Sequence, residues 1–353
     1  MINLFRPYIP EETGLEINKT LQSGQIAQGA KVEEFEREFC KLFNVKYALS
    51  LNSGTSALET AYDIIKLKEG DEVITTPLTC TATNISLLHR GVKIVWADVL
   101  EDTLCIDPLD VQAKITEKTK AIVQVHLGGV KADVGVQHIP VVSDACQALG
   151  IFNGDFTCCS FQAIKHITTG DGGMLVVESG GIAHIIKLLR WFGIDREREV
   201  DNNWKAYKTR MMSFDIDILG YKRQMNDICA TMGLVGLRHY AEALAHRKLL
   251  FNIYRQYLSA IDGIKIIDGK ENVYWLFTVL VENRDDFARM LYNAKVDTNL
   301  VQIRNDIYSV FGGERADLPT LNKIEDKYIS LPIGTHVSEE NVHYIGRKIQ
   351  EGW

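Results

Sequence analysis

The 353-residue chain has no surplus of basic residues: 39 lysines and arginines stand against 46 aspartates and glutamates, for a formal net charge of −7. Proteins that bind nucleic acid usually carry a basic surplus or stripe, because contacts to phosphate dominate their affinity. The sequence contains no basic run. We therefore expect no nucleic-acid partner.

Long apolar segments are also missing. No stretch approaches the roughly 20 apolar residues that a membrane-spanning helix needs. The first ten residues, MINLFRPYIP, include an arginine and two prolines, whereas a signal peptide has an apolar core there. These absences predict a cytoplasmic protein with no membrane partner.

Cysteines with metal-binding spacing are absent as well. The seven cysteines form no CxxC pair, and the only close pair is the adjacent Cys158-Cys159. A zinc site needs spaced cysteine and histidine ligands, so we expect no metal. Buried free thiols in a reducing compartment account for these residues.

Between residues 45 and 180, short segments rich in valine and isoleucine alternate with helical or loop segments such as the helix expected over Ser56–Lys68. This alternation predicts an α/β domain with a mostly parallel, seven-stranded sheet between helices. Periodicity leaves the direction of the last strand open. The expected strands are Tyr47–Leu51, Glu72–Thr76, Lys93–Asp98, Ala121–His126, Val141–Asp144, Cys158–Phe161 and Met174–Val177.

The rest of the chain predicts a smaller α+β domain, in line with the length, which suggests about two domains. We expect a large domain over residues 1–240 and a small C-terminal domain over 241–353, with the boundary inside a helical stretch at 224–260. The other expected elements are strands Gly263–Ile267, Val273–Val281 and Tyr328–Leu331, and helices Asp285–Asn293 and Glu339–Gln350.

Ser53-Gly54-Thr55 lies between an expected strand and an expected helix. Glycine allows a tight turn there, and the free N–H groups of a helix N-terminus bind phosphate well. An ordinary turn with a serine or threonine cap explains the same residues. Both interpretations stay open on this segment alone.

Asp144 ends an apolar strand and begins Asp144-Ala145-Cys146-Gln147. Open α/β sheets bind their ligands at the carboxyl ends of such strands. An anion there suits a protonated pyridine nitrogen, which needs a negative partner. A helix cap is an equally good explanation of Asp144 by itself.

Lys165 lies among apolar and small residues directly after another expected strand, whereas most lysines are solvated surface charges. Partial burial lowers the pKa of an amine and favours the neutral nucleophile that forms a Schiff base. Gly170, Gly172 and Gly173 allow the backbone to approach closely. They form no GxGxxG dinucleotide fingerprint.

In this order, the segments resemble the DegT-like family of pyridoxal-phosphate sugar-nucleotide aminotransferases. The likeness covers essentially the whole chain, and the lysine segment is its most specific part. It implies the fold type I of pyridoxal-phosphate-dependent transferases. The other matching segments are Ser23–Gly29, Phe35-Glu36, Gly70–Val73, Met225–Asp227 and Leu331-Pro332.

The resemblance implies a role for each matching residue. Lys165 carries pyridoxal 5'-phosphate as a Schiff base and moves a proton between the substrate carbon and the cofactor. Asp144 pairs with the pyridine nitrogen, and Gln147 approaches the phenolic oxygen. The phosphate is expected to bind the amides of Gly54 and Thr55 and the Ser160 hydroxyl.

Two positions depart from the family pattern. The family often has a ring-stacking aromatic residue where Pro77-Leu78-Thr79 is followed by Cys80, so a thiol is expected at the cofactor. The family usually has asparagine after Gly220-Tyr221, where Lys222 offers a charged phosphate contact instead. Family members are usually dimers with shared active sites, so we expect a homodimer in which Gly220–Asn226 reaches the partner site. Without the resemblance, this segment is equally a solvated helix start.

The implied reaction is an aminotransfer in two halves, as in amino-sugar or surface-polysaccharide biosynthesis. L-glutamate gives its amine, leaving pyridoxamine 5'-phosphate as the intermediate, and a nucleotide-linked keto-deoxy sugar receives it. Candidate substrate contacts lie in Trp191–Arg198 and Val301–Tyr308, with Arg196, Arg304 and Asn305. The first segment is equally well explained as a helix end stacked on its neighbour.

Two other functions are compatible with this fold. Sugar dehydratases that use pyridoxamine phosphate replace the Schiff-base lysine by histidine, and here Lys165 is followed by His166. A non-catalytic regulator would be expected to have lost Lys165 or Asp144, and both are present. Amino transfer is therefore the expected function.

Overall fold

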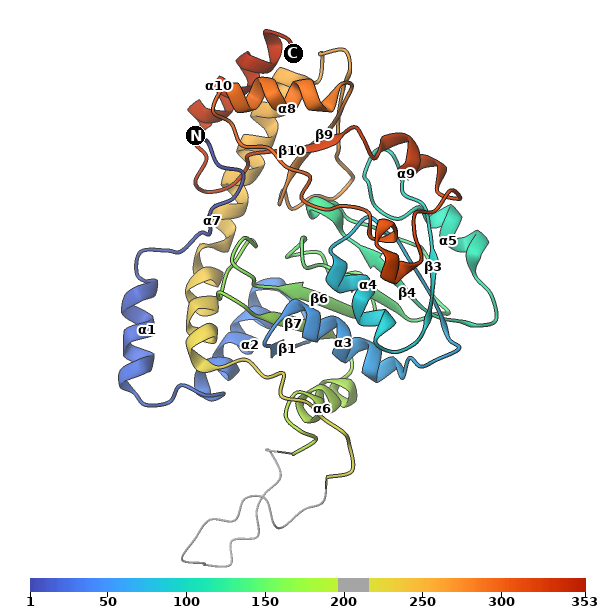
Figure 1. Ribbon diagram of the computed structural model, residues 1–353. Helices are drawn as coiled ribbons and strands as arrows, with labels where there is room; N and C mark the ends of the chain where they lie inside the picture. The colour runs from blue at the N-terminus through green and yellow to red at the C-terminus, as the bar shows by residue number, and fades with distance from the viewer. Residues whose placement is uncertain (196–215) are drawn as a thin grey trace, which may run out of the picture.

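The computed structural model describes residues 1–195 and 216–353, which form two sheets joined by one long helix (Figure 1). The larger sheet has the order β1-β7-β6-β5-β4-β2-β3. Its strands are β1 (Tyr47–Leu51), β2 (Glu72–Thr75), β3 (Lys93–Trp96), β4 (Thr119–Val125), β5 (Val141–Asp144), β6 (Phe156–Ser160) and β7 (Gly173–Val177).

Strand β7 is the one strand of this sheet that runs against the others. It pairs antiparallel with both β1 and β6, while the pairs from β6 through β5, β4 and β2 to β3 are parallel. The predicted seven-stranded, mostly parallel sheet is confirmed. The direction of its last strand, which periodicity left open, is antiparallel.

Helices cover both faces of the large sheet, which explains why its strands are mostly apolar and buried. On one face, Phe35 and Leu234 pack against Met174. On the other face, Leu58 packs against Leu175. The covering helices are α2 (Ala30–Phe43) and the first half of α7 (Asp227–Leu258) on the first face, and α3 (Gly54–Ile65) and α6 (Gly180–Leu189) on the second.

The smaller, antiparallel sheet has the order β10-β9-β8 and packs against the second half of α7. Figure 1 shows α7 running from the large sheet to this part of the molecule, where both chain termini lie. The predicted division between residues 240 and 241 falls inside α7 and stays a prediction. The elements here are β8 (Ile264–Ile266), β9 (Phe277–Val281), β10 (Tyr328–Leu331), α8 (Arg284–Asn293) and α10 (Glu339–Gln350).

The strand expected over Val273–Val281 begins only at Phe277, so its first half was predicted wrongly. Tyr274 has a left-handed φ of 54°, which ends any extended run. Its N–H donates to the side chain of Asn272 at 2.7 Å. The N–H of residue 273 donates across to the Gly129 carbonyl at 2.9 Å. This segment therefore binds the large domain instead of the small sheet.

The remaining elements are short, and they precede or connect the strands of the two sheets. No helix in the described part of the chain is long and apolar enough to cross a membrane. The elements are α1 (Thr13–Gln22), α4 (Thr81–Leu88), α5 (Pro108–Lys114), α9 (Pro319–Ile324) and the 3₁₀ turns Leu127–Gly129, Asn305–Ile307 and Ser309–Phe311.

Candidate active site

The three predicted motifs follow strands that end at the same edge of the large sheet. Strands β1, β5 and β6 run in one direction, because β7 is antiparallel to both β1 and β6. Gly54 follows β1, Asp144 ends β5, and Lys165 follows β6. Ligands of open α/β sheets bind at such carboxyl ends. The topology therefore brings together segments that are far apart in the sequence.

The turn after β1 is built as the start of a helix. Ser53 caps α3, and its hydroxyl accepts the Ser56 N–H at 3.0 Å. The N–H groups of Gly54 and Thr55 lie in the first turn, where a helix has no internal acceptor for them. Together with the positive end of the helix dipole, they can bind a phosphate.

Gly54 lies in direct contact with the other two motifs. A Cβ atom on Gly54 would lie 2.8 Å from the Cys146 sulfur and 2.9 Å from the Ser160 Cβ. On the other side, Gly173 of β7 leaves room for the turn, because a Cβ there would overlap the Ser53 carbonyl and lie 2.7 Å from the Gly54 nitrogen. The lack of side chains at 54 and 173 thus allows the Gly54–Thr55 turn to pack closely against its neighbours. This turn is called the cradle below.

Asp144 is a buried carboxylate, 3% exposed, with a donor on each oxygen. The Cys146 N–H donates to Oδ1 at 3.0 Å, and the Thr83 hydroxyl donates to Oδ2 at 2.6 Å. Gln147 is also buried, and its side-chain oxygen accepts the Gly128 N–H at 2.9 Å. These bonds hold both side chains in place.

Lys165 is half-buried, and its amine lies 4.1 Å from the centre of the Trp275 ring. The Trp275 ring is fixed by a hydrogen bond from its Nε1 to the Ile164 carbonyl at 3.1 Å. An ammonium group over an indole face is stabilised by the ring quadrupole. Trp275 can therefore stabilise the charged amine of Lys165 when that amine has no other partner.

Burial lowers the pKa of Lys165, while the nearby Cys146 and Cys80 thiols and the Asp144 carboxylate act in the opposite direction. A lowered pKa increases the share of neutral amine at neutral pH. The neutral amine is the form that attacks a carbonyl and accepts a proton. Cys80 is an exposed free thiol, and its predicted place at the cofactor stays a prediction.

The His166 side chain forms a structural hydrogen bond. Its Nε2 lies 2.7 Å from the Val273 carbonyl, to which a ring N–H donates. Burial, followed by the charge of Arg247, lowers the pKa of His166 to about 3. His166 is therefore a neutral, structural histidine.

We expect the stability of the cofactor-free protein to fall as the pH drops below about 6.5. Burial also lowers the pKa of His126 to about 3, so His126 and His166 are neutral in the fold but bind protons when unfolded. Their contribution is complete above pH 6.5 and is lost toward pH 3, at up to about 1.4 kcal/mol per pH unit for each histidine. Denaturant unfolding from pH 4.5 to 7.5 measures this slope.

Replacing His166 by glutamine keeps a donor for the Val273 carbonyl. It should reduce that slope by the contribution of one histidine, because about one proton fewer is taken up on unfolding. The same change at the exposed His138 should leave the slope as in the wild type. Equal slopes for the two variants would contradict the assignment of buried, neutral His166.

The backbone of Lys222 lies next to the cradle. Its carbonyl accepts the Asn52 side-chain N–H at 3.4 Å, two residues before Gly54. Its exposed side chain extends over the Trp191 ring, with the amine 5.4 Å from the ring centre. Its predicted contact with a phosphate stays a prediction.

The predicted substrate residues lie in different surroundings. Arg304 is 3% exposed, and its guanidinium pairs with Asp306 at 2.6 Å and Glu325 at 2.5 Å. Asn305 is 1% exposed and bonds to residues 77–84 of the large domain. Both side chains tie parts of this chain together, and substrate contact by either stays a prediction. Arg196 lies outside the described residues.

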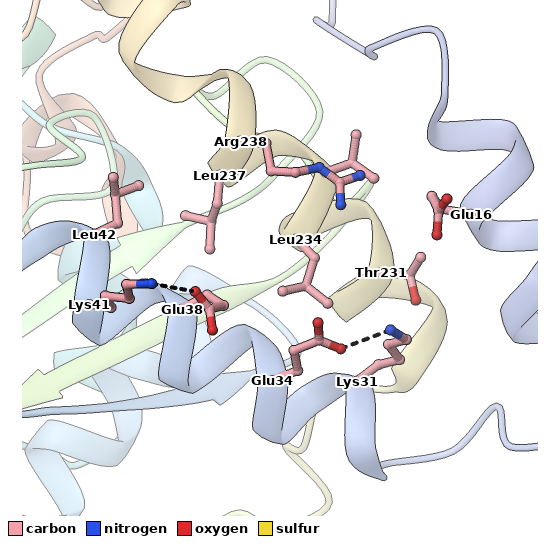
Figure 2. Close-up of a pocket in the computed structure, with 11 residues that line it drawn as sticks. Glu16, Lys31, Glu34, Glu38, Lys41, Leu42, Thr231, Leu234, Leu237 and Arg238 are labelled. Atoms are coloured by element: carbon pink, nitrogen blue, oxygen red, sulfur yellow. Dashed lines mark hydrogen bonds and ion pairs between the residues drawn. The ribbon is translucent and has the colours of Figure 1, made fainter.

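A groove of about 580 Å³ lies elsewhere, between α1, α2 and α7 (Figure 2). Four of the charged side chains that line it form two ion pairs, Lys31 with Glu34 at 2.8 Å and Lys41 with Glu38 at 3.9 Å. None of the predicted site residues lines this groove. It is therefore separate from the edge of the sheet that carries Lys165.

Two residues of the site escaped the sequence analysis, Thr83 and Trp275. Thr83 is one buried threonine among many, and only the fold shows that its hydroxyl meets Asp144. Trp275 belongs to the segment mistaken for a strand and meets Lys165 through domain packing. No local pattern around either residue points to the site.

A model of the DegT/DnrJ/EryC1/StrS aminotransferase family matches residues 7–350. The chain belongs to this family. It is 31% identical to the spore coat polysaccharide biosynthesis protein SpsC of Bacillus subtilis, over 96% of this chain and 95% of SpsC. It is 32% identical to a UDP-4-amino-4-deoxy-L-arabinose--oxoglutarate aminotransferase of Shewanella sediminis, over 74% of this chain and 70% of that protein.

Solved structures of similar proteins share the whole fold. The sugar aminotransferase CalS13 from Micromonospora echinospora matches with a TM-score of 0.91 at 29% identity, over 100% of both chains. The PLP-form of Spr1654 from Streptococcus pneumoniae matches with a TM-score of 0.87 at 26% identity, over 99% of this chain and 98% of that one. The family and these neighbours are pyridoxal-phosphate-dependent sugar aminotransferases, so the protein is an enzyme of this class.

The residues at the sheet edge fit this cofactor. The turn at Gly54, packed closely against Cys146, Ser160 and Gly173, presents the free N–H groups of a helix N-terminus, which suit a phosphate. Asp144 presents a buried anion for a protonated ring nitrogen, and Lys165 presents a partly buried amine. The three groups carry the charges that pyridoxal phosphate requires.

Proposed function

We propose that this enzyme transfers the amino group of L-glutamate to a keto-deoxy sugar carried by a nucleotide, with pyridoxal phosphate held at Lys165. The observation that carries the proposal is the meeting of Lys165, Asp144 and the Gly54 turn at one edge of the sheet. Family membership supports the reaction class. The name of the Shewanella relative, which combines a UDP-sugar with oxoglutarate, supports the donor and the acceptor.

Each residue has a distinct task in this proposal. When bound, pyridoxal phosphate supplies a ring that withdraws electrons from the bond being broken. Gly54 and Thr55 amides and the Ser160 hydroxyl hold its phosphate, while Asp144 keeps the ring nitrogen protonated. Gln147 lies beside Asp144 and is proposed to meet the phenolic oxygen. Cys80 is proposed to cover one face of the ring.

Lys165 is proposed to move the proton. Its lowered pKa lets it accept a proton from the substrate carbon as a neutral amine and return it as an ammonium group. The Trp275 face, 4.1 Å away, stabilises the ammonium form between these two events. The same lysine thereby acts as base and as acid in each half of the transfer.

A homodimer with shared sites completes the proposal. Residues 220–226 lie beside the cradle, since the Asn52 N–H donates to the Arg223 carbonyl at 2.7 Å. Arg223 itself is held by Glu59 at 2.9 Å and Asp63 at 2.7 Å, which fixes this segment. From there Lys222 is proposed to reach a phosphate in the partner's site.

The two alternatives considered from the sequence are not favoured. A dehydratase would need a histidine in place of Lys165, and His166 is bonded to the Val273 carbonyl instead. A regulator without catalysis would not need the buried Asp144 and the half-buried Lys165 that are present. The solved neighbours are sugar aminotransferases.

The deciding experiment offers the enzyme a panel of keto-sugar nucleotides after loading its cofactor with amine from L-glutamate. We expect one class of keto-sugar nucleotide to consume the amine form and yield an amino sugar, read by absorbance and mass spectrometry. A free keto sugar without its nucleotide serves as the control. A deoxygenated sugar as product would contradict the proposal and support the dehydratase.

A further inference from the structure

A chain of buried hydroxyl groups ends on the Asp144 carboxylate. The Thr83 hydroxyl lies 2.6 Å from Asp144 Oδ2, and the Thr79 hydroxyl lies 3.0 Å from that of Thr83. An ionised carboxylate can only accept, so Thr83 gives its single hydroxyl hydrogen to Asp144 and accepts from Thr79. Because all three side chains are at most 3% exposed, water does not compete for these bonds.

The segment that carries both threonines is fastened by Asn305, which comes from the distant C-terminal part of the chain. The Asn305 side-chain N–H donates to the Thr79 carbonyl at 2.9 Å, and its oxygen accepts from Asn84 at 2.9 Å. Its backbone N–H donates to the Pro77 carbonyl at 2.7 Å. One buried side chain therefore fixes the position of Thr79 and, through it, of Thr83.

Both oxygens of Asp144 thus accept a hydrogen bond, each from a different segment of the chain. Oδ1 accepts the Cys146 N–H at 3.0 Å, and Oδ2 accepts the Thr83 hydroxyl. Hydrogen bonds to an ionised group are roughly twice as strong as neutral ones. A buried oxygen that loses such a donor carries the full cost of its burial. The carboxylate therefore has one favoured plane.

We propose that Thr83 is a positioning residue for Asp144, and that Asn305 anchors it through Thr79. The Thr83 hydroxyl fixes the plane in which the carboxylate meets the pyridine nitrogen. This inference rests on the proposed use of pyridoxal phosphate at Lys165. It gives Asn305 a role different from the substrate contact expected from the sequence, because its side chain is occupied within the chain.

The test compares Thr83→Val, which keeps the shape but removes the hydroxyl, with Thr83→Ser, which keeps the hydroxyl. Cofactor-free protein is titrated with pyridoxal phosphate and followed by visible absorbance. We expect Thr83→Val to raise the dissociation constant by about 10- to 100-fold, the loss of one charge-assisted hydrogen bond. Thr83→Ser should restore binding to within about threefold, and Asn305→Ala should weaken it by about threefold to tenfold.

Steady-state kinetics supply a second measurement, in which Thr83→Val lowers kcat and leaves KM for the sugar nucleotide unchanged. The matched control is Thr231→Val. Thr231 forms a similar buried hydroxyl pair with Thr20 at 2.8 Å, away from Asp144. The Thr231→Val change should lower the melting temperature of the cofactor-free protein as much as Thr83→Val does, without weakening cofactor binding.

Wild-type binding of the cofactor by Thr83→Val, or no recovery by Thr83→Ser, would overturn the inference while the proposed function stands. If Thr83→Val does not fold, Thr83→Ala replaces it, and failure of both would show a role in folding alone and also overturn the inference. A wild-type protein that binds no pyridoxal phosphate would overturn the proposed function and this inference with it.

Discussion

We expect Lys165→Ala to reduce turnover with L-glutamate by about 10³-fold or more while the protein stays folded. The change removes the group that holds the cofactor and the group that moves the proton, and general acid–base catalysis alone contributes about 10²- to 10⁴-fold. The lysine side chain is half-buried and rests on Trp275, so its loss leaves the surrounding core in place. Single-turnover assays with glutamate measure the loss.

Borohydride reduction gives a readout that does not depend on turnover. Reduction of the loaded wild-type protein should attach the cofactor covalently to Lys165, as mapped by mass spectrometry, and the alanine variant should show no attachment. Lys118→Ala removes an exposed lysine just before β4 and should behave like the wild type. A Lys165→Ala protein that completes full catalytic cycles would rule out the assigned role.

Gly173→Ala should be the most damaging of the glycine-to-alanine changes at this site. The new Cβ would overlap the Ser53 carbonyl and lie 2.7 Å from the Gly54 nitrogen, and backbone atoms cannot rotate away as side chains can. Strand β7 is paired on both sides and is fully buried, so it cannot retreat. The Gly54 turn must therefore move, and with it the phosphate-binding amides.

Overpacking of a close-fitting core typically costs about 1–3 kcal/mol. We expect Gly173→Ala to lower the free energy of unfolding by about 2–3 kcal/mol, measured by denaturant titration, and to weaken pyridoxal phosphate binding in addition. Gly181→Ala is the matched control, because a Cβ there meets only the Ser179 hydroxyl at 3.8 Å. Unchanged stability and cofactor affinity in Gly173→Ala would show that the turn is not held as described.

Much of the fold was predictable because its elements follow local patterns. The strand Val141–Asp144 and the helix Glu339–Gln350 were predicted with their observed bounds, since apolar runs and helical spacing mark them. The strand at Val273–Val281 was predicted too long. Its first residues are apolar like a strand, but Tyr274 takes a left-handed conformation and the chain binds the turn at Gly129.

The candidate site was predictable only as separate motifs. Gly54 and Lys165 each follow a strand and Asp144 ends one, but the order of the strands in the sheet, which decides whether these motifs meet, comes from the structure. The partners of Arg304 are visible only in the folded chain. An arginine in a loop suggests a contact with an anionic substrate, but its acidic partners, Asp306 and Glu325, belong to the chain itself.

The alternation of strands and helices and the separate motifs around Gly54, Asp144 and Lys165 could be identified from the sequence alone, because turns, apolar periods and reactive side chains are local. The type of reaction followed from the resemblance of these motifs to a family. The direction of β7, the contact between Lys165 and Trp275, and the chain from Asn305 to Asp144 were decided only by the tertiary structure. The contact between Lys165 and Trp275 and the bonds that lead from Asn305 to Asp144 join segments more than about 50 positions apart, and the direction of β7 depends on its pairing with both β1 and β6. Their geometry depends on how layers pack, which no short segment encodes.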